Sequence, residues 1–160
     1  MIKVVFVCLG NICRSPMAEA IFKHIINEQG LDAVVESDSC GTANYHVGDD
    51  ADPRTLSAVR TRGIAIDHCV RQLSVVDLDE YDYVLAMDRS NYKNILRLAN
   101  AQTRSKILMM RDFDAGHSGE EVPDPYYGNQ KHFEEVYEIL YRSLSGFVDF
   151  LIKTERNRLA

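Results

Sequence analysis

A cysteine and an arginine separated by five residues stand near the start of the chain, in the run Cys8-Leu9-Gly10-Asn11-Ile12-Cys13-Arg14-Ser15. Gly10 and Asn11 are residue types that tolerate a positive φ, so a loop of this length can turn several backbone N–H groups inward and form an anion-binding cradle. A thiol at its centre is surrounded by N–H dipoles, a helix N-terminus and the Arg14 guanidinium, all of which favour the thiolate. We therefore expect Cys8 to be a nucleophile at neutral pH.

Arg14 complements this nucleophile, because its planar guanidinium matches two phosphoryl oxygens and stabilises their charge in the transition state. The Gly-Lys-Ser/Thr run of nucleotide-binding Walker loops is absent, and no second Cys or His pair stands at metal-ligand spacing, so we expect no metal and no other cofactor. The Cys-x5-Arg spacing alone is a weak signal, since a cysteine at a strand end is often simply buried. The neighbouring Gly10 and Asn11 and the helix-capping signal Ser15-Pro16 favour the chemical interpretation.

A second candidate group, Asp124, lies in the run Pro123-Asp124-Pro125-Tyr126-Tyr127. The flanking prolines hold this segment extended. The adjacent tyrosines should shield the carboxyl from water, and Glu120 and Glu121 add like charge, so both effects favour the protonated acid. Asp124 is therefore a candidate general acid, although Asp-Pro is also a common turn signal.

The elements that position these groups alternate between strands and helices. Apolar, β-branched runs predict strands at Ile2–Cys8, Val34–Cys40, Tyr81–Met87 and Lys106–Met110. Capping residues and helical periodicity predict helices from Ser15 to Gly30, Asp52 to Gly63, Asp88 to Ala99 and Phe133 to Leu151, with loops at 43–51 and 111–131. This alternation predicts an α/β, three-layer, flavodoxin-like sandwich with a four-stranded parallel sheet, whose ligands bind where residues 8–15 lie, after the first strand.

The composition is that of an ordinary globular protein. The chain has 160 residues, 46% hydrophobic and 26% charged, with a net charge of −6 at pH 7, and fits a single domain over residues 1–160. The negative charge and the lack of a basic run argue against nucleic-acid partners. The N-terminal apolar stretch is too short for membrane insertion and lacks a signal cleavage site. The four cysteines would stay reduced in the cytoplasm, where we expect the protein to act.

The motifs V-C-L-G-N-I-C-R-S-P-M-A-E-A at the start and D-P-Y-Y-G near the end resemble those of the low-molecular-weight protein tyrosine phosphatases. Between them, S-C-G-T, D-P-R, D-H-x-x-R-Q and M-D-x-S-N look like that family's intermediate blocks, in order (residues 39–42, 52–54, 67–72 and 87–91). The resemblance spans nearly the whole chain. It implies that Cys8 attacks the phosphorus of a phosphotyrosine, that Arg14 binds the phosphoryl group, and that Asp124 protonates the leaving phenol and then activates water against phosphocysteine.

The resemblance also implies roles for surrounding residues. The phosphate-binding loop would comprise Leu9, Gly10, Asn11, Ile12, Cys13 and Ser15, in which Asn11 holds the loop and Ser15 assists the thiolate. His68 matches a histidine that supports Asn11. Tyr126 and Tyr127 match one aromatic wall of a substrate slot, and Tyr45 stands where the family often has tryptophan on the other, so the slot should select phosphotyrosine over the shorter phosphoserine. Cys13 matches a loop cysteine that can form a disulfide with oxidised Cys8.

Three other functions stay open at this point. Thioredoxin-coupled arsenate reductases share the Cys-x5-Arg loop but need further cysteines in a segment, residues 73–100, that here has none. Protein-arginine phosphatases of the same family usually carry threonine where this chain has Ile12. A non-catalytic phosphotyrosine-binding module would not need Cys8, Arg14 and Asp124 together. The expected partners are phosphotyrosine-containing proteins, with a tyrosine kinase as a candidate, and the expected oligomeric state is a monomer or weak dimer.

Overall fold

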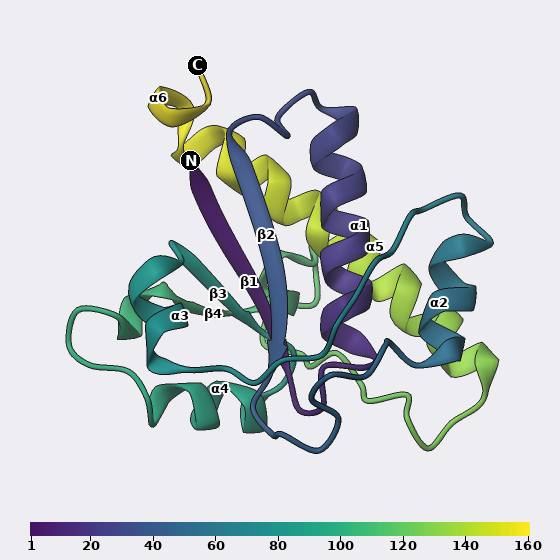
Figure 1. The fold of residues 1–160 in the computed structure, drawn as a ribbon. Coiled ribbons are helices and arrows are strands. Elements are labelled where there is room, and N and C mark those ends of the chain that lie inside the picture. Colours follow the sequence, from purple (N-terminus) through teal and green to yellow (C-terminus); the bar gives the residue numbers. More distant parts are fainter.

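The computed structural model describes residues 1–160 and arranges four parallel strands in the order β2-β1-β3-β4 (Figure 1). The central strand β1 (Ile2–Cys8) pairs with β2 (Val35–Gly41) and β3 (Tyr83–Ala86), and β3 also pairs with β4 (Ile107–Met109). All of β1 except Lys3 is buried, as its continuous apolar run predicts. Its carboxyl end delivers Cys8 to one edge of the sheet, which is where parallel sheets bind their ligands.

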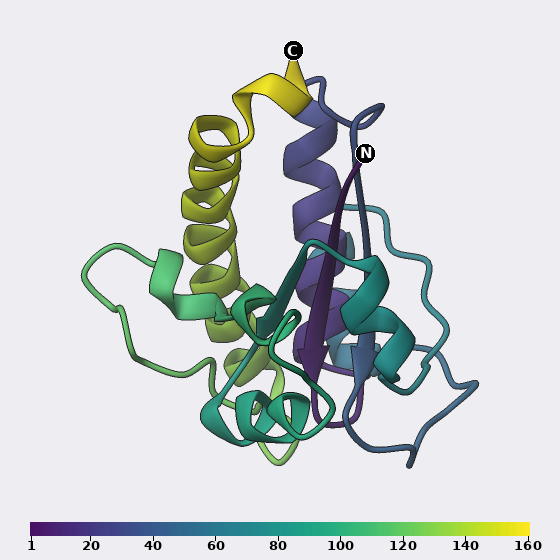
Figure 2. The ribbon, with the colours of Figure 1, turned by 90° about the vertical axis from the view of Figure 1, so that its left-hand side faces the viewer.

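Helices cover both faces of the sheet, so the predicted three-layer α/β sandwich is confirmed (Figures 1 and 2). One face carries α1 (Arg14–Glu28), α2 (Pro53–Arg60) and α5 (Gln130–Thr154), followed by the short α6 (Arg156–Leu159). The other face carries α3 (Val75–Glu80) and α4 (Arg89–Leu96). Two short 3-10 helices, η1 (Arg104–Lys106) and η2 (Met110–Phe113), flank β4.

The larger hydrophobic core lies between the sheet and the helices α1 and α5. Phe22 of α1 packs against Phe6 of β1, with ring centroids 5.4 Å apart, and against Phe147 of α5, with centroids 5.8 Å apart. On the opposite face a smaller core joins Val5 of β1 to side chains such as Ile95 of α4. Burial of these apolar side chains on both faces fixes β1, and with it the position of Cys8.

The long helix α5 is tied to η2 by close packing and by charge. Gly146 lies so near η2 that a Cβ at this position would overlap the carbonyl oxygen of Phe113, which accounts for glycine inside a helix. Next to this contact, the buried Asp114 accepts hydrogen bonds from Arg142 and Arg111. Although burial opposes its charge, these two arginines hold the pKa of Asp114 below its ordinary value.

Several predicted boundaries are wrong. The strand expected over residues 81–87 contains only Tyr83–Ala86, and the one expected over 106–110 shrinks to three residues because its two ends belong to η1 and η2. The loop expected over 111–131 begins later, after η2, and α5 begins at Gln130. The helix α3 was not predicted. A capping box formed by Ser74 and Asp77 closes its first turn.

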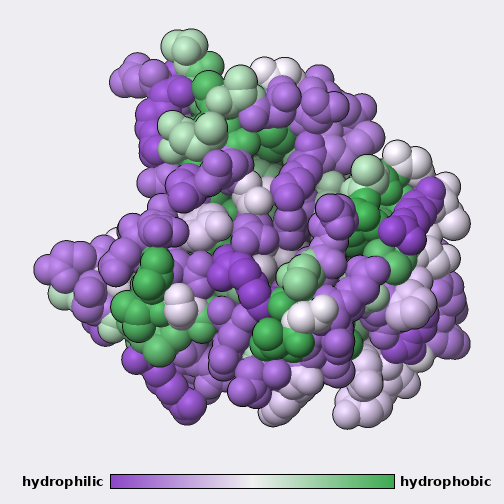
Figure 3. All heavy atoms as spheres, in the orientation of Figure 1, coloured by the Kyte–Doolittle hydropathy of each residue, from purple (hydrophilic) through white to green (hydrophobic).

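The exposed surface is mixed in character. Figure 3 shows a mostly hydrophilic face with separate hydrophobic patches. No helix is both long enough and apolar enough to cross a membrane.

Candidate active site

The segment between β1 and α1, here called the 8–15 loop, closes around the sulfur of Cys8. Cys8 is only 2% exposed. Its Sγ lies 2.9 Å from Ser15 Oγ, and the backbone N–H of Asn11 donates to it at 3.3 Å. Two donors at these distances can each hydrogen-bond a thiolate, as the inward-facing loop predicts.

Asn11 sets the shape of this loop. It is the only non-glycine residue with a positive φ, 58°, a conformation that asparagine tolerates better than most residues. Gly10 does not share this conformation, so the conformational role expected for this glycine is wrong. A Cβ at Gly10 would lie 3.5 Å from the His46 ring, at the rim of the cavity described below.

Four hydrogen bonds hold Asn11 in place. Its Nδ2 donates to Ser15 Oγ at 2.8 Å and to Ser39 Oγ at 3.0 Å, and its Oδ1 accepts from the N–H of Arg71 at 3.2 Å. Its carbonyl oxygen lies 2.7 Å from His68 Nε2, in agreement with the supporting role expected for His68. Ser39 lies on β2, whereas His68 and Arg71 lie in the stretch between α2 and α3.

Ser15 lies inside α1 rather than at its cap. The helix begins one residue earlier, and its N-cap makes no side-chain hydrogen bond, so the capping role predicted for Ser15 is wrong. Because the Ser15 hydroxyl accepts from Asn11, its own hydrogen is free to point at Cys8 Sγ, 2.9 Å away. The competing acceptor, the carbonyl oxygen of Cys40, is 3.5 Å away. The Ser15 hydroxyl is therefore placed to hydrogen-bond the Cys8 sulfur and does not cap the helix.

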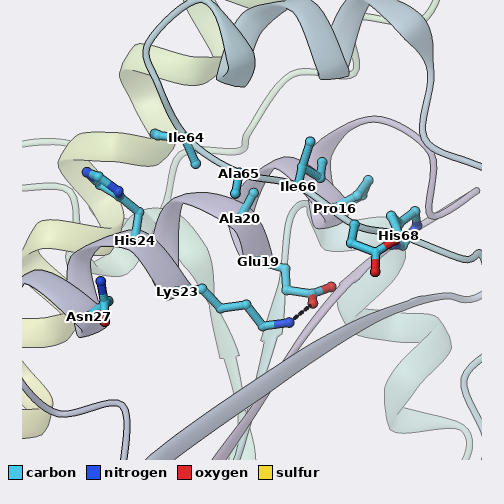
Figure 4. A pocket seen from close by; sticks show the side chains of 11 residues that line it. Pro16, Glu19, Ala20, Lys23, His24, Asn27, Ile64, Ala65, Ile66 and His68 are labelled. Carbon is cyan, nitrogen blue, oxygen red and sulfur yellow. Dashed lines mark hydrogen bonds and ion pairs between the residues drawn. The ribbon is translucent and has the colours of Figure 1, made fainter.

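Behind the loop, the buried carboxylate of Glu19 extends the network to the surface. It accepts from Ser39 Oγ at 2.7 Å and forms an ion pair with Lys23. Figure 4 shows Glu19, Lys23 and His68 around a surface cavity of about 390 Å³. Sequence reasoning missed Ser39 and Glu19, although both lie inside the motifs S-C-G-T and M-A-E-A.

Arg14 is 2% exposed and is oriented by groups far along the chain. Its Nη1 donates to Asp88 Oδ2 at 2.7 Å and to the carbonyl oxygen of Val122 at 3.0 Å, and its Nη2 lies 3.6 Å from Asp124 Oδ2. Although burial opposes the charge, Cys8, Asp88 and Asp124 raise the pKa of Arg14 above its ordinary value. Asp88 caps α4 as predicted, but its bond to Arg14 was missed.

Asp124 lies beside Arg14 but is more open to water than predicted. Its side chain is 42% exposed, and its Oδ1 accepts from the N–H of Tyr126 at 3.1 Å. The expected shielding by both tyrosines is wrong, because Tyr127 projects outward and is 95% exposed. The expected like charge is offset, because Glu121 forms an ion pair with Arg89 and Glu120 with Arg111.

Arg54 holds the segment that carries Asp124, a role that sequence reasoning missed although Arg54 ends the motif D-P-R. Its guanidinium forms a two-bond pair with Asp52 at 3.0 and 2.9 Å. It also donates to the carbonyl oxygens of Tyr126 at 3.0 Å and Gly128 at 2.9 Å, and it lies 4.4 Å from the centre of the Phe133 ring. Planar stacking together with forked hydrogen bonding is a use of arginine that lysine does not reproduce.

A cavity of about 350 Å³ joins these groups. Its lining contains the predicted residues Cys8, Leu9, Gly10, Ile12, Cys13, Arg14, Tyr45, Asp124, Tyr126 and Tyr127. The remaining predicted residues, Asn11, Ser15 and His68, hold the 8–15 loop from outside the cavity. His46 also lines the cavity. Sequence reasoning missed it, because the only signal in its favour is that it directly follows Tyr45.

Cys13 shares the cavity with Cys8 but has different surroundings. Its side chain is buried, and burial together with the nearby Asp52 carboxylate raises the pKa of the Cys13 thiol well above its ordinary value. The thiol therefore stays protonated at neutral pH, and of the two cysteines only Cys8 has hydrogen-bond donors facing its sulfur.

Comparison with known proteins identifies the family. The family model described as low molecular weight phosphotyrosine protein phosphatase matches residues 3–157. Proteins of this description are 44% identical over 137 residues in Schizosaccharomyces pombe (85% of this chain, 88% of that protein) and 37% identical over 148 residues in Homo sapiens (91% and 93%). A crystal structure of a protein tyrosine phosphatase from Entamoeba histolytica has a TM-score of 0.93 at 39% identity, covering 97% of this chain and 99% of that one. The chain belongs to the low molecular weight phosphotyrosine protein phosphatase family.

Proposed function

We propose that Cys8, Arg14 and Asp124 hydrolyse protein phosphotyrosine through a phosphocysteine intermediate, within one domain that spans residues 1–160. The observation that carries the proposal is the convergence of these three side chains on one cavity, in which Arg14 Nη2 lies 3.6 Å from Asp124 Oδ2. They supply a nucleophile, a fork for phosphoryl oxygens and a proton donor.

In the first step the Cys8 thiolate attacks phosphorus. The S–P bond forms as the bond between phosphorus and the phenolic oxygen breaks, and the proton of the Asp124 carboxyl passes to that oxygen. Arg14 and the inward N–H groups of the 8–15 loop stabilise the charge on the equatorial oxygens. The product phenol leaves from the side on which Asp124 is open to water.

In the second step the Asp124 carboxylate takes a proton from the water that attacks phosphocysteine. The S–P bond breaks, inorganic phosphate is released and the electron pair returns to the Cys8 sulfur. Ser15 Oγ at 2.9 Å and the Asn11 N–H at 3.3 Å are placed to stabilise this departing thiolate. The hydroxyl of Ser15 thus contributes most where sulfur is the leaving group.

We further propose that the lining of the cavity selects phosphotyrosine. Tyr45 and Tyr126 offer aromatic surface to a phenyl ring, and Ile12 of the 8–15 loop adds an apolar side chain to the lining. Because Cys8 is 2% exposed, the short side chain of phosphoserine reaches the sulfur poorly. Ile12 also suits an aromatic leaving group better than the guanidinium of phosphoarginine.

Phosphotyrosine-containing proteins are the substrates that the family implies, and a tyrosine kinase acting on the same proteins is the partner that we propose. We also propose a cytoplasmic location, supported by four cysteines that are all free thiols. The separate hydrophobic patches in Figure 3, with no continuous apolar face in that view, support a monomer or weak dimer.

The test is a comparison of wild type with Cys8→Ser on matched peptides carrying phosphotyrosine, phosphoserine or phosphoarginine, and on arsenate with thioredoxin. Wild type should release phosphate fastest from phosphotyrosine. Cys8→Ser should bind the phosphopeptide without turnover, because the hydroxyl is a poor nucleophile while the loop and Arg14 remain. Cys69→Ser, which removes an exposed cysteine, is the matched control and should stay active. Wild-type-like turnover by Cys8→Ser would refute the mechanism, and faster release from phosphoarginine would refute the selectivity.

A further inference from the structure

A second hollow adjoins the active-site cavity. It has a volume of about 570 Å³, and Leu9 and Tyr45 line both spaces. Its other walls come from the segments after β2 and before α3, and from the last turn of α4 with the residues that follow it, namely Asn94, Arg97 and Leu98. Figures 1 and 2 show these segments at the same end of the sheet as the 8–15 loop. The second hollow is therefore within reach of a residue that neighbours a phosphotyrosine bound in the first cavity.

Arg97 is the one charged side chain in the lining of this hollow. Other arginines around the site are paired: Arg14 with Asp88, Arg54 with Asp52, and Arg71 with Asp38 and Asp77. Arg97 is exposed, and no carboxylate lies within ion-pair distance of it. The hollow therefore presents one uncompensated cation on a protein whose net charge is −6.

We infer that this hollow binds a residue flanking the phosphotyrosine and that Arg97 selects an acidic side chain there. The inference rests on the proposed function, because it concerns the substrate of that same site. Leu9 and Leu98 offer apolar contact to the methylene groups of a glutamate side chain, and Arg97 pairs with its carboxylate. Asn94, a half-buried residue in the lining of the same hollow, carries an amide that can donate a hydrogen bond to this carboxylate.

The size and the kinetic signature of the effect follow from this geometry. An exposed ion pair changes affinity by about two- to fivefold, and the preference weakens as ionic strength rises. The contact is remote from the reacting atoms and acts equally on bound substrate and transition state, so it changes KM and leaves kcat alone. An effect on catalysis through loop distortion would instead lower kcat.

The test uses phosphotyrosine peptides that carry a single glutamate, or the isosteric glutamine, at each neighbouring position on either side. The measured quantity is the ratio of kcat/KM for the glutamate and glutamine peptides within each variant, with p-nitrophenyl phosphate as a substrate that has no flanking residues. The variants are Arg97→Gln, Arg97→Glu and the control Lys93→Gln. Lys93 is also exposed on α4 and does not line the hollow, so its replacement removes the same charge elsewhere.

Wild type and Lys93→Gln should prefer glutamate about two- to fivefold at one or more positions through KM, Arg97→Gln should lose the preference, and Arg97→Glu should disfavour glutamate. Equal ratios in wild type and Arg97→Gln, with p-nitrophenyl phosphate still hydrolysed, would overturn the subsite while the proposed function stands. An equal loss of preference in Lys93→Gln would also overturn it, because the effect would then be one of net charge. Failure of wild type to hydrolyse p-nitrophenyl phosphate would refute the proposed function and the subsite with it.

Discussion

Replacing Asn11 by alanine or by glycine separates its two contributions, the hydrogen bonds of its side chain and its left-handed backbone. Both variants lose the three side-chain hydrogen bonds to Ser15, Ser39 and Arg71. At about 1 kcal/mol each, this lowers the free energy of unfolding by about 3 kcal/mol. With φ at 58°, alanine should lose about 1 kcal/mol more than glycine, because its Cβ opposes the left-handed conformation.

The assay is urea unfolding at pH 7. The free energies of unfolding are compared between variants for which this free energy falls with urea concentration at the same slope. Ser57, an exposed residue inside α2, is the control site. There the order should reverse, and alanine should be more stable than glycine by roughly 0.5–1 kcal/mol, as in ordinary helices. If Asn11→Ala proves as stable as Asn11→Gly, the backbone at this position is not strained for alanine. If neither variant loses stability, the hydrogen bonds of Asn11 do not hold the loop.

Three further variants test other parts of the site and fold. Asp124→Asn should slow hydrolysis of phosphotyrosine by about 10²- to 10⁴-fold and slow esters of more acidic phenols less, measured as kcat across a series of aryl phosphates; an equal loss throughout would count against the general acid. Cys13→Ser should remain active, but after peroxide it should not recover in dithiothreitol, because Cys8 then oxidises past sulfenic acid without a resolving thiol; recovery equal to wild type would make Cys13 a packing residue. Asp114 has a pKa below its ordinary value in the folded state, so it stabilises the fold above about pH 4 and loses this contribution as the pH falls further. Asp114→Asn should therefore lower the free energy of unfolding by about 3 kcal/mol at pH 7. As the pH falls below about 4, its free energy of unfolding should decrease less steeply than that of wild type, and an equally steep decrease would contradict this role.

Elements with a long or uniform pattern could be predicted from the sequence. The apolar run of β1 and the repeating apolar stripe of α5 each mark a face that must be buried. Both elements and their burial are confirmed, although α5 extends past the predicted bounds at both ends. Helix α3 could not be predicted in this way, because it has only six residues and three of them are acidic. It depends on its capping box rather than on an amphipathic pattern.

The site was predictable where its residues are neighbours in sequence. Cys8, Asn11 and Arg14 fall within one loop, so their types and spacing indicate a common anion site. The bonds of Arg14 to Asp88 and of Arg54 to Gly128 each join residues 74 positions apart, and nothing local in either segment reveals the partner. Ser15 shows the converse error, since a serine before proline is typical of a helix cap, yet the nearby sulfur and the Asn11 amide provide better partners.

The stretch from residue 64 to residue 71 contains no helix or strand, yet it supplies two of the three contacts that hold Asn11 from outside the 8–15 loop, those from His68 and Arg71. Backbone hydrogen bonds fasten it to the rest of the chain mainly at its two ends, through Ile64 and through Val70 and Arg71. Segments of this kind open in local fluctuations that cost far less free energy than global unfolding. Heat inactivation is therefore expected to begin as a sub-global event, with amide hydrogen exchange rising in this stretch and activity falling while the helical circular dichroism signal is still intact.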